Sequence, residues 1–424
     1  MSTHPVICWT ESGEARFARW RSESGAPPAG HVVIADDHMT ADDAYGLACQ
    51  GTALLWRGDF QNARRMLLAM ASRADRQYRK PKKPKKSAAA SGPTAPAEVF
   101  HLHRQARAQR ARTLGALLVP LDEAYGIPLR RAPDVRQACA EAYGPAEGPS
   151  LVSLRALLGL IGAHEWRIKG IEITALGGRI YPHYGVFAPI RHEYVQLVAA
   201  APLSALNSPS SVAFDIGTGT GVLAGVLARR GIRRIVATDS DPRALACARE
   251  NLERLGLAEQ VEVAQADLFP AGRAALVVCN PPWVPARPSS PLERGIYDPE
   301  SRMLRGFLGG LRAHLEPGGE GWLILSDLAE HLGLRSRPEL LATFDAAELK
   351  VLDRNDARPK HPRASDESDA FHAARAAEVT SLWRLAARGG VSAGETYAVL
   401  PSAMPSPVPS LNVATEQIQS RSEV

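Results

Sequence analysis

The tetrapeptide Asn280-Pro281-Pro282-Trp283 has the residue types needed for chemistry on a nitrogen atom. The Asn280 side-chain oxygen and the Pro281 carbonyl are both acceptors, which suits an incoming –NH2 group with its two donors. Such a nitrogen in adenine, guanine or glutamine is a poor nucleophile because its lone pair is delocalised. Two acceptors can orient it and favour a pyramidal nitrogen, which stabilises the transition state of methylation more than the ground state. Trp283 offers a flat face for stacking on a base or an amide plane.

The residues before the tetrapeptide place it at the end of a strand. Residues 275–279 are apolar throughout, which predicts a buried strand, and two consecutive prolines then end the ladder. Ligands of open α/β sheets bind beyond the carboxyl ends of the strands. A rigid loop without chemistry is the alternative, because Asn-Pro and Pro-Pro also mark turns. The position about 60 residues past a glycine-rich loop favours the functional interpretation.

That glycine-rich loop follows Asp215 and contains Gly217, Gly219 and Gly221. A short apolar run at 211–216 predicts a strand before it, and the apolar spacing at 222–230 predicts a helix after it. Glycines in such a turn let the backbone bend sharply and let a nucleotide-like ligand approach without a Cβ in the way. A glycine pattern alone is weak evidence, because ordinary tight turns also need glycine.

Two acidic residues strengthen the prediction of a cofactor site. Asp239 ends a second predicted strand about 20 residues past the glycines, where a carboxylate can hold ribose hydroxyls. Asp267 follows a third predicted strand at 260–264 and could accept the amino group of adenine. The alternatives are a surface acid or a helix cap for Asp239, although Asp241 before Pro242 suits the cap better. A simple loop acid remains the alternative for Asp267.

Together these motifs resemble those of class I S-adenosylmethionine (SAM)-dependent methyltransferases of the Asn/Asp-Pro-Pro-aromatic type. That group includes N6-adenine and N2-guanine nucleic-acid methyltransferases and release-factor glutamine methyltransferases. The resemblance covers residues 186–386 and implies a Rossmann-like α/β fold whose seven-stranded sheet has an antiparallel last strand. It also implies that SAM is the cofactor and assigns residues to it. The cofactor residues are Asp215, Gly217, Gly219 and Gly221 in the SAM loop, Asp239 at the ribose, Asp267 at the adenine, and Asn280. The acceptor motif, which would hold the methyl acceptor and carry the catalysis, consists of Asn280, Pro281, Pro282 and Trp283.

A segment upstream of the glycine loop bears on the substrate. Residues 184–193, with Arg191 and Glu193, look like the segment that closes over the cofactor in glutamine and small-domain members of the group. The acidic-Thr pair of many glutamine methyltransferases is absent, which weakens a release-factor assignment.

Composition narrows the class of protein. The chain has 424 residues, a net charge of +5 and no apolar run long enough to span a membrane, and its start does not have the features of a signal peptide. Its five cysteines are scattered without a Cys-x-x-Cys pair, which predicts neither a metal site nor a disulfide scaffold and indicates a cytoplasmic protein. Cys279 is expected to pack on its strand rather than react.

The N-terminal half is expected to be mostly helical, with a strand at 31–35 and a helical pattern over 41–78, and to recognise the substrate. A hairpin at 172–181 that turns at Gly177-Gly178 is expected to lead into the catalytic domain. The predicted divisions are a helical region at 1–78, a basic Pro/Lys/Ala-rich linker at 79–97, a helical cap at 98–165, the methyltransferase domain at 166–390 and a disordered tail at 391–424. Lysines of the linker, and an arginine face formed by Arg104, Arg107 and Arg110, could contact phosphates. A solvated linker is the equal alternative for the lysines.

The sequence therefore predicts a SAM-dependent N-methyltransferase acting on an exocyclic amine of a nucleic acid, RNA more than DNA. The alternative substrate is a glutamine amide of a protein. A non-catalytic SAM-binding or RNA-binding protein is a more distant alternative, and a nicotinamide dehydrogenase would have no use for Asn-Pro-Pro-Trp.

Overall fold

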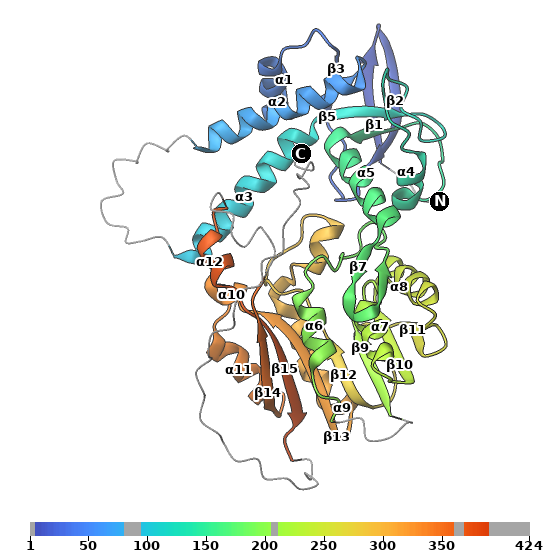
Figure 1. Ribbon diagram of the computed structural model, residues 1–424. Helices are drawn as coiled ribbons and strands as arrows, with labels where there is room; N and C mark the ends of the chain where they lie inside the picture. Colours follow the sequence, from blue (N-terminus) through green and yellow to red (C-terminus); the bar gives the residue numbers. More distant parts are fainter. Residues whose placement is uncertain (1–4, 80–94, 205–210, 360–368, 390–424) are drawn as a thin grey trace, which may run out of the picture.

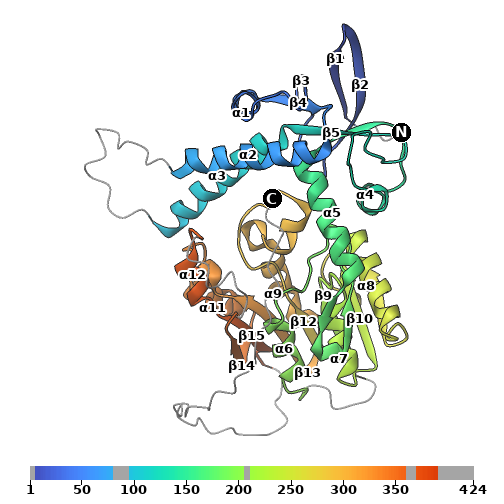
Figure 2. The same cartoon turned by 45° about the horizontal axis from the view of Figure 1, so that its top comes forward.

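Two sheets, each with its own helices, organise the chain in the computed structural model, which describes residues 5–79, 95–204, 211–359 and 369–389. A six-stranded sheet forms in the N-terminal part and a seven-stranded sheet in the C-terminal part (Figure 1). Helix α5 (Leu154–Lys169) begins at the first sheet and runs towards the second, as Figures 1 and 2 both show. We refer to the two parts as the N-terminal unit and the catalytic unit.

The sheet of the catalytic unit has the strand order β11-β10-β9-β12-β13-β15-β14. Five neighbouring strands are parallel, and β15 is antiparallel to both β13 and β14, as the family resemblance implies. The strands are β9 (Val212–Ile216), β10 (Arg234–Asp239), β11 (Val261–Gln265), β12 (Ala274–Cys279), β13 (Leu315–Ser326), β14 (Leu349–Ala357) and β15 (Thr380–Ala387). The four strands predicted before Asn280 correspond to β9, β10, β11 and β12, and the Rossmann-like fold class is confirmed.

Alternation along the central strands builds two cores, one on each face of this sheet. Ala213 and Val278 contribute to one cluster, while Phe214 and Val277 contribute to the other. Successive side chains of a strand point to opposite faces, so a strand that is buried on both faces is apolar at every position. The helices are α6 (Glu193–Ala200), α7 (Val222–Arg229) and α8 (Pro242–Arg254) with the first cluster, and α9 (Arg302–His314) and α11 (Arg337–Ala346) with the second.

The N-terminal unit corrects the expectation of a helical region at 1–78 and a helical cap at 98–165. It contains a mixed sheet of order β1-β2-β6-β5-β4-β3. Its strands are β1 (Val6–Glu11), β2 (Glu14–Arg21), β3 (His31–Ala35), β4 (Thr52–Trp56), β5 (Leu117–Leu121) and β6 (Ser150–Ser153). Its helices are α1 (Ala41–Cys49), α2 (Phe60–Arg79), α3 (Pro96–Gly115), α4 (Arg136–Tyr143) and α5. Only β3 among these strands matches a predicted one.

Two local features explain the strands that the helical pattern concealed. Gly51 has a φ of +87°, which ends α1 and starts β4, whose last four residues are all buried. Ser12 and Gly13 both have positive φ, the geometry of a tight hairpin turn that joins β1 to β2. A helix prediction over 41–78 is therefore wrong at 52–56, where the apolar run packs in a sheet.

Short elements complete the catalytic unit. They are the hairpin of β7 (Ile171–Ile173) and β8 (Gly178–Ile180), the one-turn helices η1 (Thr174–Leu176), η2 (Pro291–Gly295) and η3 (Pro299–Ser301), and the helices α10 (Leu328–His331) and α12 (His372–Ala377). The hairpin confirms the predicted turn at Gly177, which has a φ of +60°. The lysines of the predicted linker and the predicted tail lie outside the described residues. Within the described residues, no helix combines the length and apolar character needed to cross a bilayer.

Candidate active site

The predicted site residues gather at one edge of the seven-stranded sheet. The register pairs Ile216 with Thr238 of β10 and with Cys279 of β12, and pairs Asp239 with Gln265 of β11. The carboxyl ends of these parallel strands therefore lie side by side. The glycine loop, Asp239, Asp267 and Asn280 follow or end those strands at the same edge, where open α/β sheets bind ligands.

Asp215 holds the glycine loop in shape. Its carboxylate is buried, and Oδ2 accepts hydrogen bonds from the Thr218 hydroxyl at 2.7 Å and from the Ala224 amide at 3.0 Å. Burial raises the pKa of Asp215 to about 6, against the lowering effect of the Thr218 hydrogen bond. The amide of Thr218 also donates to the Thr238 carbonyl, which joins the loop to β10. The contacts that Asp215 makes here organise the start of α7.

The three glycines have positive φ for different reasons. A Cβ at Gly217 would lie 2.4 Å from Met303 Cε, and one at Gly221 would lie 3.3 Å from the Ala248 backbone. A Cβ at Gly219, by contrast, would meet nothing within 4 Å. A side chain at Gly217 would have to displace the flexible end of Met303, and one at Gly221 would crowd the backbone of α8. Gly219 keeps the open side of the loop free of a side chain, which is what the approach of a ligand needs.

Asp239 lies directly against this open side of the loop. Its Oδ2 accepts from the Gly219 amide at 3.0 Å, and its Oδ1 accepts from the Asp241 amide at 2.9 Å. Burial raises the pKa of Asp239, although these backbone hydrogen bonds oppose the rise. Asp241 caps α8 by accepting from the Arg243 amide, which confirms the predicted cap, while the ribose contact of Asp239 stays a prediction.

Asp267 is exposed, and its carboxylate pairs with Arg302 at 3.0 Å. Both side chains are mostly exposed, so this ion pair is weak and can be exchanged for another contact. Asp267 stands at the same sheet edge as Asp239, and its role at the adenine stays a prediction.

The acceptor motif adopts a geometry that its residue types alone do not reveal. The indole N–H of Trp283 donates to the Asn280 side-chain oxygen at 2.9 Å. One lone pair of that oxygen is thereby engaged, and the amide plane is fixed in orientation while the second lone pair remains for another donor. Trp283 is half-buried and packs against three core clusters, and Pro281 is buried. The motif is therefore a rigid part of the fold.

An ion-pair cluster beside Trp283 was not predicted in full. The Arg191 guanidinium lies 5.0 Å from the centre of the Trp283 ring and donates to Glu378 at 2.9 Å. Glu378 is buried and also accepts from the Ser326 hydroxyl at 2.6 Å. Glu193 holds the other side of Arg191 at 2.5 Å. The sequence pointed to Arg191 and Glu193, but Glu378 lies almost 190 residues away in the chain and carried no signal.

The N-terminal unit reaches the loop that follows the acceptor motif. Arg104 of α3 stacks on Tyr297, 3.9 Å from the ring centre, and donates to the Arg287 carbonyl at 2.7 Å. Phe100, one turn earlier, is buried in a cluster with Val284. Figure 2 shows the end of α3 beside α12, on the same side as this loop. Arg110 pairs with Asp75. Two of the three arginines of the predicted face therefore make contacts within the protein.

Two further predictions concern reactive and metal-binding groups. Cys279 is buried on β12, and burial raises the pKa of its thiol, so it packs as a neutral group. In the described part of the chain, His, Cys, Asp and Glu side chains form no cluster of three that could hold a metal ion.

Comparison with known proteins decides the family of the catalytic unit. Residues 178–351 match the model of the methyltransferase small domain family. This match agrees with the resemblance of the segment to class I SAM-dependent methyltransferases. A release factor glutamine methyltransferase of Cereibacter sphaeroides is 33% identical over 171 residues, which cover 37% of this chain and 60% of that protein. A ribosomal protein L11 methyltransferase of Pelotomaculum thermopropionicum is 49% identical over 74 residues, covering 17% and 24%.

The chain spans less than two thirds of the length of these two relatives, so the similarity concerns the methyltransferase domain. Among solved structures, a SAM-dependent methyltransferase of Thiobacillus denitrificans in complex with S-adenosylhomocysteine is 18% identical and covers 48% of this chain and 92% of its own, with a TM-score of 0.32. The cofactor of the methyltransferase domain is SAM. The residues at the sheet edge fit it, because Gly219 leaves the loop open and Asp239 presents a carboxylate beside it.

Proposed function

We propose that this chain methylates the side-chain amide nitrogen of a glutamine in a protein substrate. The observation that carries the proposal is the Asn280 side chain, which Trp283 holds by a hydrogen bond at the sheet edge beside the glycine loop. An acceptor fixed in this way can orient an –NH2 group. The amide of glutamine and the exocyclic amine of a base both carry this group, so other observations must decide between them.

Two observations favour a protein substrate. The similar proteins bear the names release factor glutamine methyltransferase and ribosomal protein L11 methyltransferase, and both names state a protein substrate. The arginine face that suggested phosphate binding is partly engaged within the chain, because Arg104 contacts Tyr297 and Arg110 contacts Asp75. Arginines engaged in this way contribute less to binding a nucleic-acid backbone.

The proposed roles follow from the geometry. When bound, SAM supplies a methyl group on a positively charged sulfur, which is a strong electrophile. Asp239 accepts from ribose hydroxyls, and the loop at Gly219 gives the room for the cofactor. The free lone pair of Asn280 and the carbonyl of Pro281 accept from the two N–H groups of the acceptor amide. That orientation favours a pyramidal nitrogen, whose lone pair is no longer delocalised into the carbonyl and can attack the methyl carbon.

A nucleic-acid substrate is the second candidate, and a specific feature favours it. Burial lowers the pKa of Arg155 on α5, and the nearby charges of Arg110 and Arg107 lower it further. Like charges gathered in this way repel one another, and a phosphate group placed among them would relieve the repulsion.

Methyl transfer from radiolabelled SAM into a cell extract tests both candidates. We expect the label to be lost on protease digestion and to resist nuclease; label lost to nuclease alone would replace glutamine by a nucleic acid. Asn280→Ala should abolish the transfer, while Asn355→Ala on the edge strand β14 serves as a control and should retain it. If Asn280→Ala transfers methyl groups at the native rate, the role of this side chain is wrong.

A further inference from the structure

A cavity of about 450 Å³ is lined mainly by the N-terminal unit and, from the catalytic unit, by Arg243 at the start of α8. Its walls come from the end of β2 and the loop that follows, from the end of α4, and from the first turn of α8. Trp20 and Tyr143 are aromatic side chains of this lining, and Arg21 and Arg243 are its cations. Cavities of this volume are of the size that holds small organic ligands.

Arg21 is the feature that gives the cavity a chemical character. The residue is 6% exposed, and neither Nε nor Nη2 has a hydrogen-bond partner among the residues that the structure describes. Its guanidinium lies 5.5 Å from the ring centre of Tyr143 and 6.0 Å from that of Tyr125. A buried cation without a partner is costly, and aromatic faces compensate only part of that cost.

The carboxylates of this region are paired with other cations. Glu23 accepts from Arg243 at 2.7 Å, and Glu147 pairs with Arg19. Arg243 also donates to the Ala142 carbonyl at the end of α4. Arg21 therefore has no carboxylate partner among these residues, although its unpaired Nε and Nη2 are closed off from solvent, and Arg243 lines the cavity from α8. The planar fork of a guanidinium matches the oxygens of a carboxylate or a phosphate.

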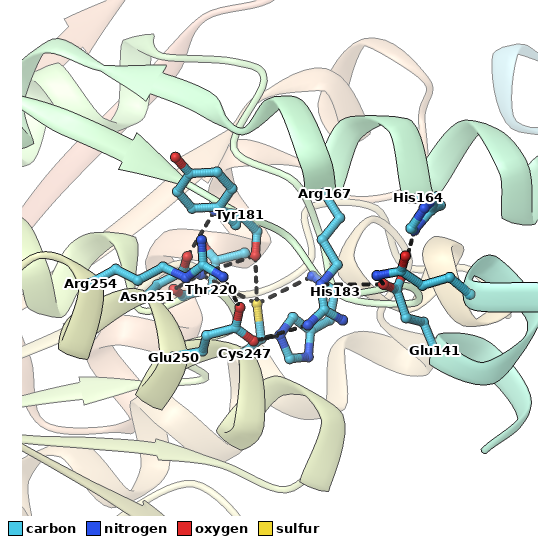
Figure 3. A network of polar contacts seen from close by, with 11 residues as sticks. Glu141, His164, Arg167, Tyr181, His183, Thr220, Cys247, Glu250, Asn251 and Arg254 are labelled. Carbon is cyan, nitrogen blue, oxygen red and sulfur yellow. Dashed lines mark hydrogen bonds and ion pairs between the residues drawn. The ribbon is translucent and has the colours of Figure 1, made fainter. Parts of the chain in front are cut away.

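A network of ion pairs holds these walls together (Figure 3). Arg167 of α5 lies 3.8 Å from Glu141 of α4 and 3.0 Å from Glu250 of α8. His164 pairs with Glu141, and His183 pairs with Glu250 at 2.6 Å. Because α4 and α8 both contribute residues to the cavity, these contacts join two of the elements that line it.

We propose that this cavity binds a small organic anion, whose carboxylate or phosphate group pairs with Arg21 and whose flat apolar body packs against Trp20 and Tyr143. The oxyanion gives the guanidinium a charged partner from the cavity side, and the aromatic and proline side chains cover the remainder of the ligand. The site is separate from the SAM loop, although Arg243 belongs to the helix that Asp241 caps.

Isothermal titration calorimetry on the full chain tests the site with three probes. Benzoate and phenyl phosphate carry the two oxyanions on the same ring, and benzyl alcohol is a neutral compound of similar shape. We expect at least one anion to bind and benzyl alcohol to bind about tenfold more weakly or not at all, since the charged contact supplies most of the affinity. Binding of benzoate alone identifies a carboxylate ligand, and binding of phenyl phosphate alone identifies a phosphate ligand.

Two variants and a control locate the binding. Arg21→Gln should weaken anion binding by about tenfold or more, whereas Arg16→Gln makes the same change at an exposed position of β2 and should leave it unchanged. Ala26→Trp, on the exposed loop of the lining, should block the cavity without touching the buried guanidinium. Circular dichroism and SAM binding establish that each variant is folded. The proposal is overturned if neither anion binds, if benzyl alcohol binds as tightly as the anions, or if folded Ala26→Trp and Arg21→Gln bind them as the native chain does.

Discussion

Replacing Asp239 by Asn tests the cofactor site without knowledge of the methyl acceptor. The two carboxylate oxygens of Asp239 already accept from the Gly219 and Asp241 amides and lie at the open side of the glycine loop. An asparagine keeps the size of the side chain but turns one acceptor into a donor. We expect SAM to bind more weakly to this variant, because one ribose hydroxyl no longer has an anionic acceptor.

The size of the effect follows from the strength of a single charged hydrogen bond. Such a bond contributes about 1.5–3 kcal/mol, and the variant cannot form the one between the carboxylate and the ribose. Since each 1.4 kcal/mol is about a factor of ten in affinity, the dissociation constant should rise by about 10-fold to 150-fold. Burial raises the pKa of Asp239, so SAM affinity of the native chain should also fall as the pH is lowered towards that pKa. The Asn variant should show a flatter pH profile.

Titration calorimetry with SAM at neutral and acidic pH measures both effects. Asp241→Asn is the matched control, because it makes the same change two residues away and asparagine caps a helix as well as aspartate does. The control should bind SAM within about threefold of the native chain. If Asp239→Asn binds as tightly as this control, Asp239 does not hold the ribose and the placement of the cofactor is wrong.

Three further changes probe the acceptor motif, the loop and the contact between units. Trp283→Phe removes the indole N–H that holds the Asn280 side chain. The rate of methyl transfer, measured with radiolabelled SAM, should therefore fall about fivefold, while the affinity for SAM stays unchanged. Above pH 6 the Asp215→Asn variant should have a free energy of unfolding about 3 kcal/mol higher than that of the native chain, because burial raises the pKa of Asp215 to about 6. The difference should vanish below about pH 4, where the aspartate is protonated in both the folded and the unfolded state. Urea unfolding across this pH range measures the difference, and a value that does not change with pH would contradict the prediction. Phe100→Ala should cost about 3–5 kcal/mol of unfolding free energy, because this buried ring joins α3 to the catalytic unit; an unchanged urea midpoint would show that the contact contributes nothing.

The sequence predicted the catalytic unit well because its signals are local. Each central strand is a short apolar run, as at 275–279, and each turn that is predicted to bind ligand carries glycine or proline beside a polar or acidic residue. Local patterns of this kind need no knowledge of distant contacts. The cap at Asp241 and the hairpin at Gly177 were predictable for the same reason.

Features that depend on distant pairing could not be predicted. The helix prediction is wrong at β4, because four buried residues in a row fit either element until neighbours at β3 and β5 pair with them. Glu378 joins Arg191 only through the order of strands in the finished sheet. The bond between Trp283 and Asn280 depends on how two prolines bend the chain, which the residue types do not specify.

The place of β15 in the sheet has a consequence for synthesis of the chain. This strand inserts between β13 and β14, although it is the last of the three to leave the ribosome. Until it emerges, β13 and β14 each expose an unpaired edge, and such edges can pair with other chains. The N-terminal unit has by then long been made and can fold first. The period of greatest risk of aggregation therefore falls between the synthesis of β13 and that of β15, and chaperones that bind nascent chains are expected to matter most in that interval.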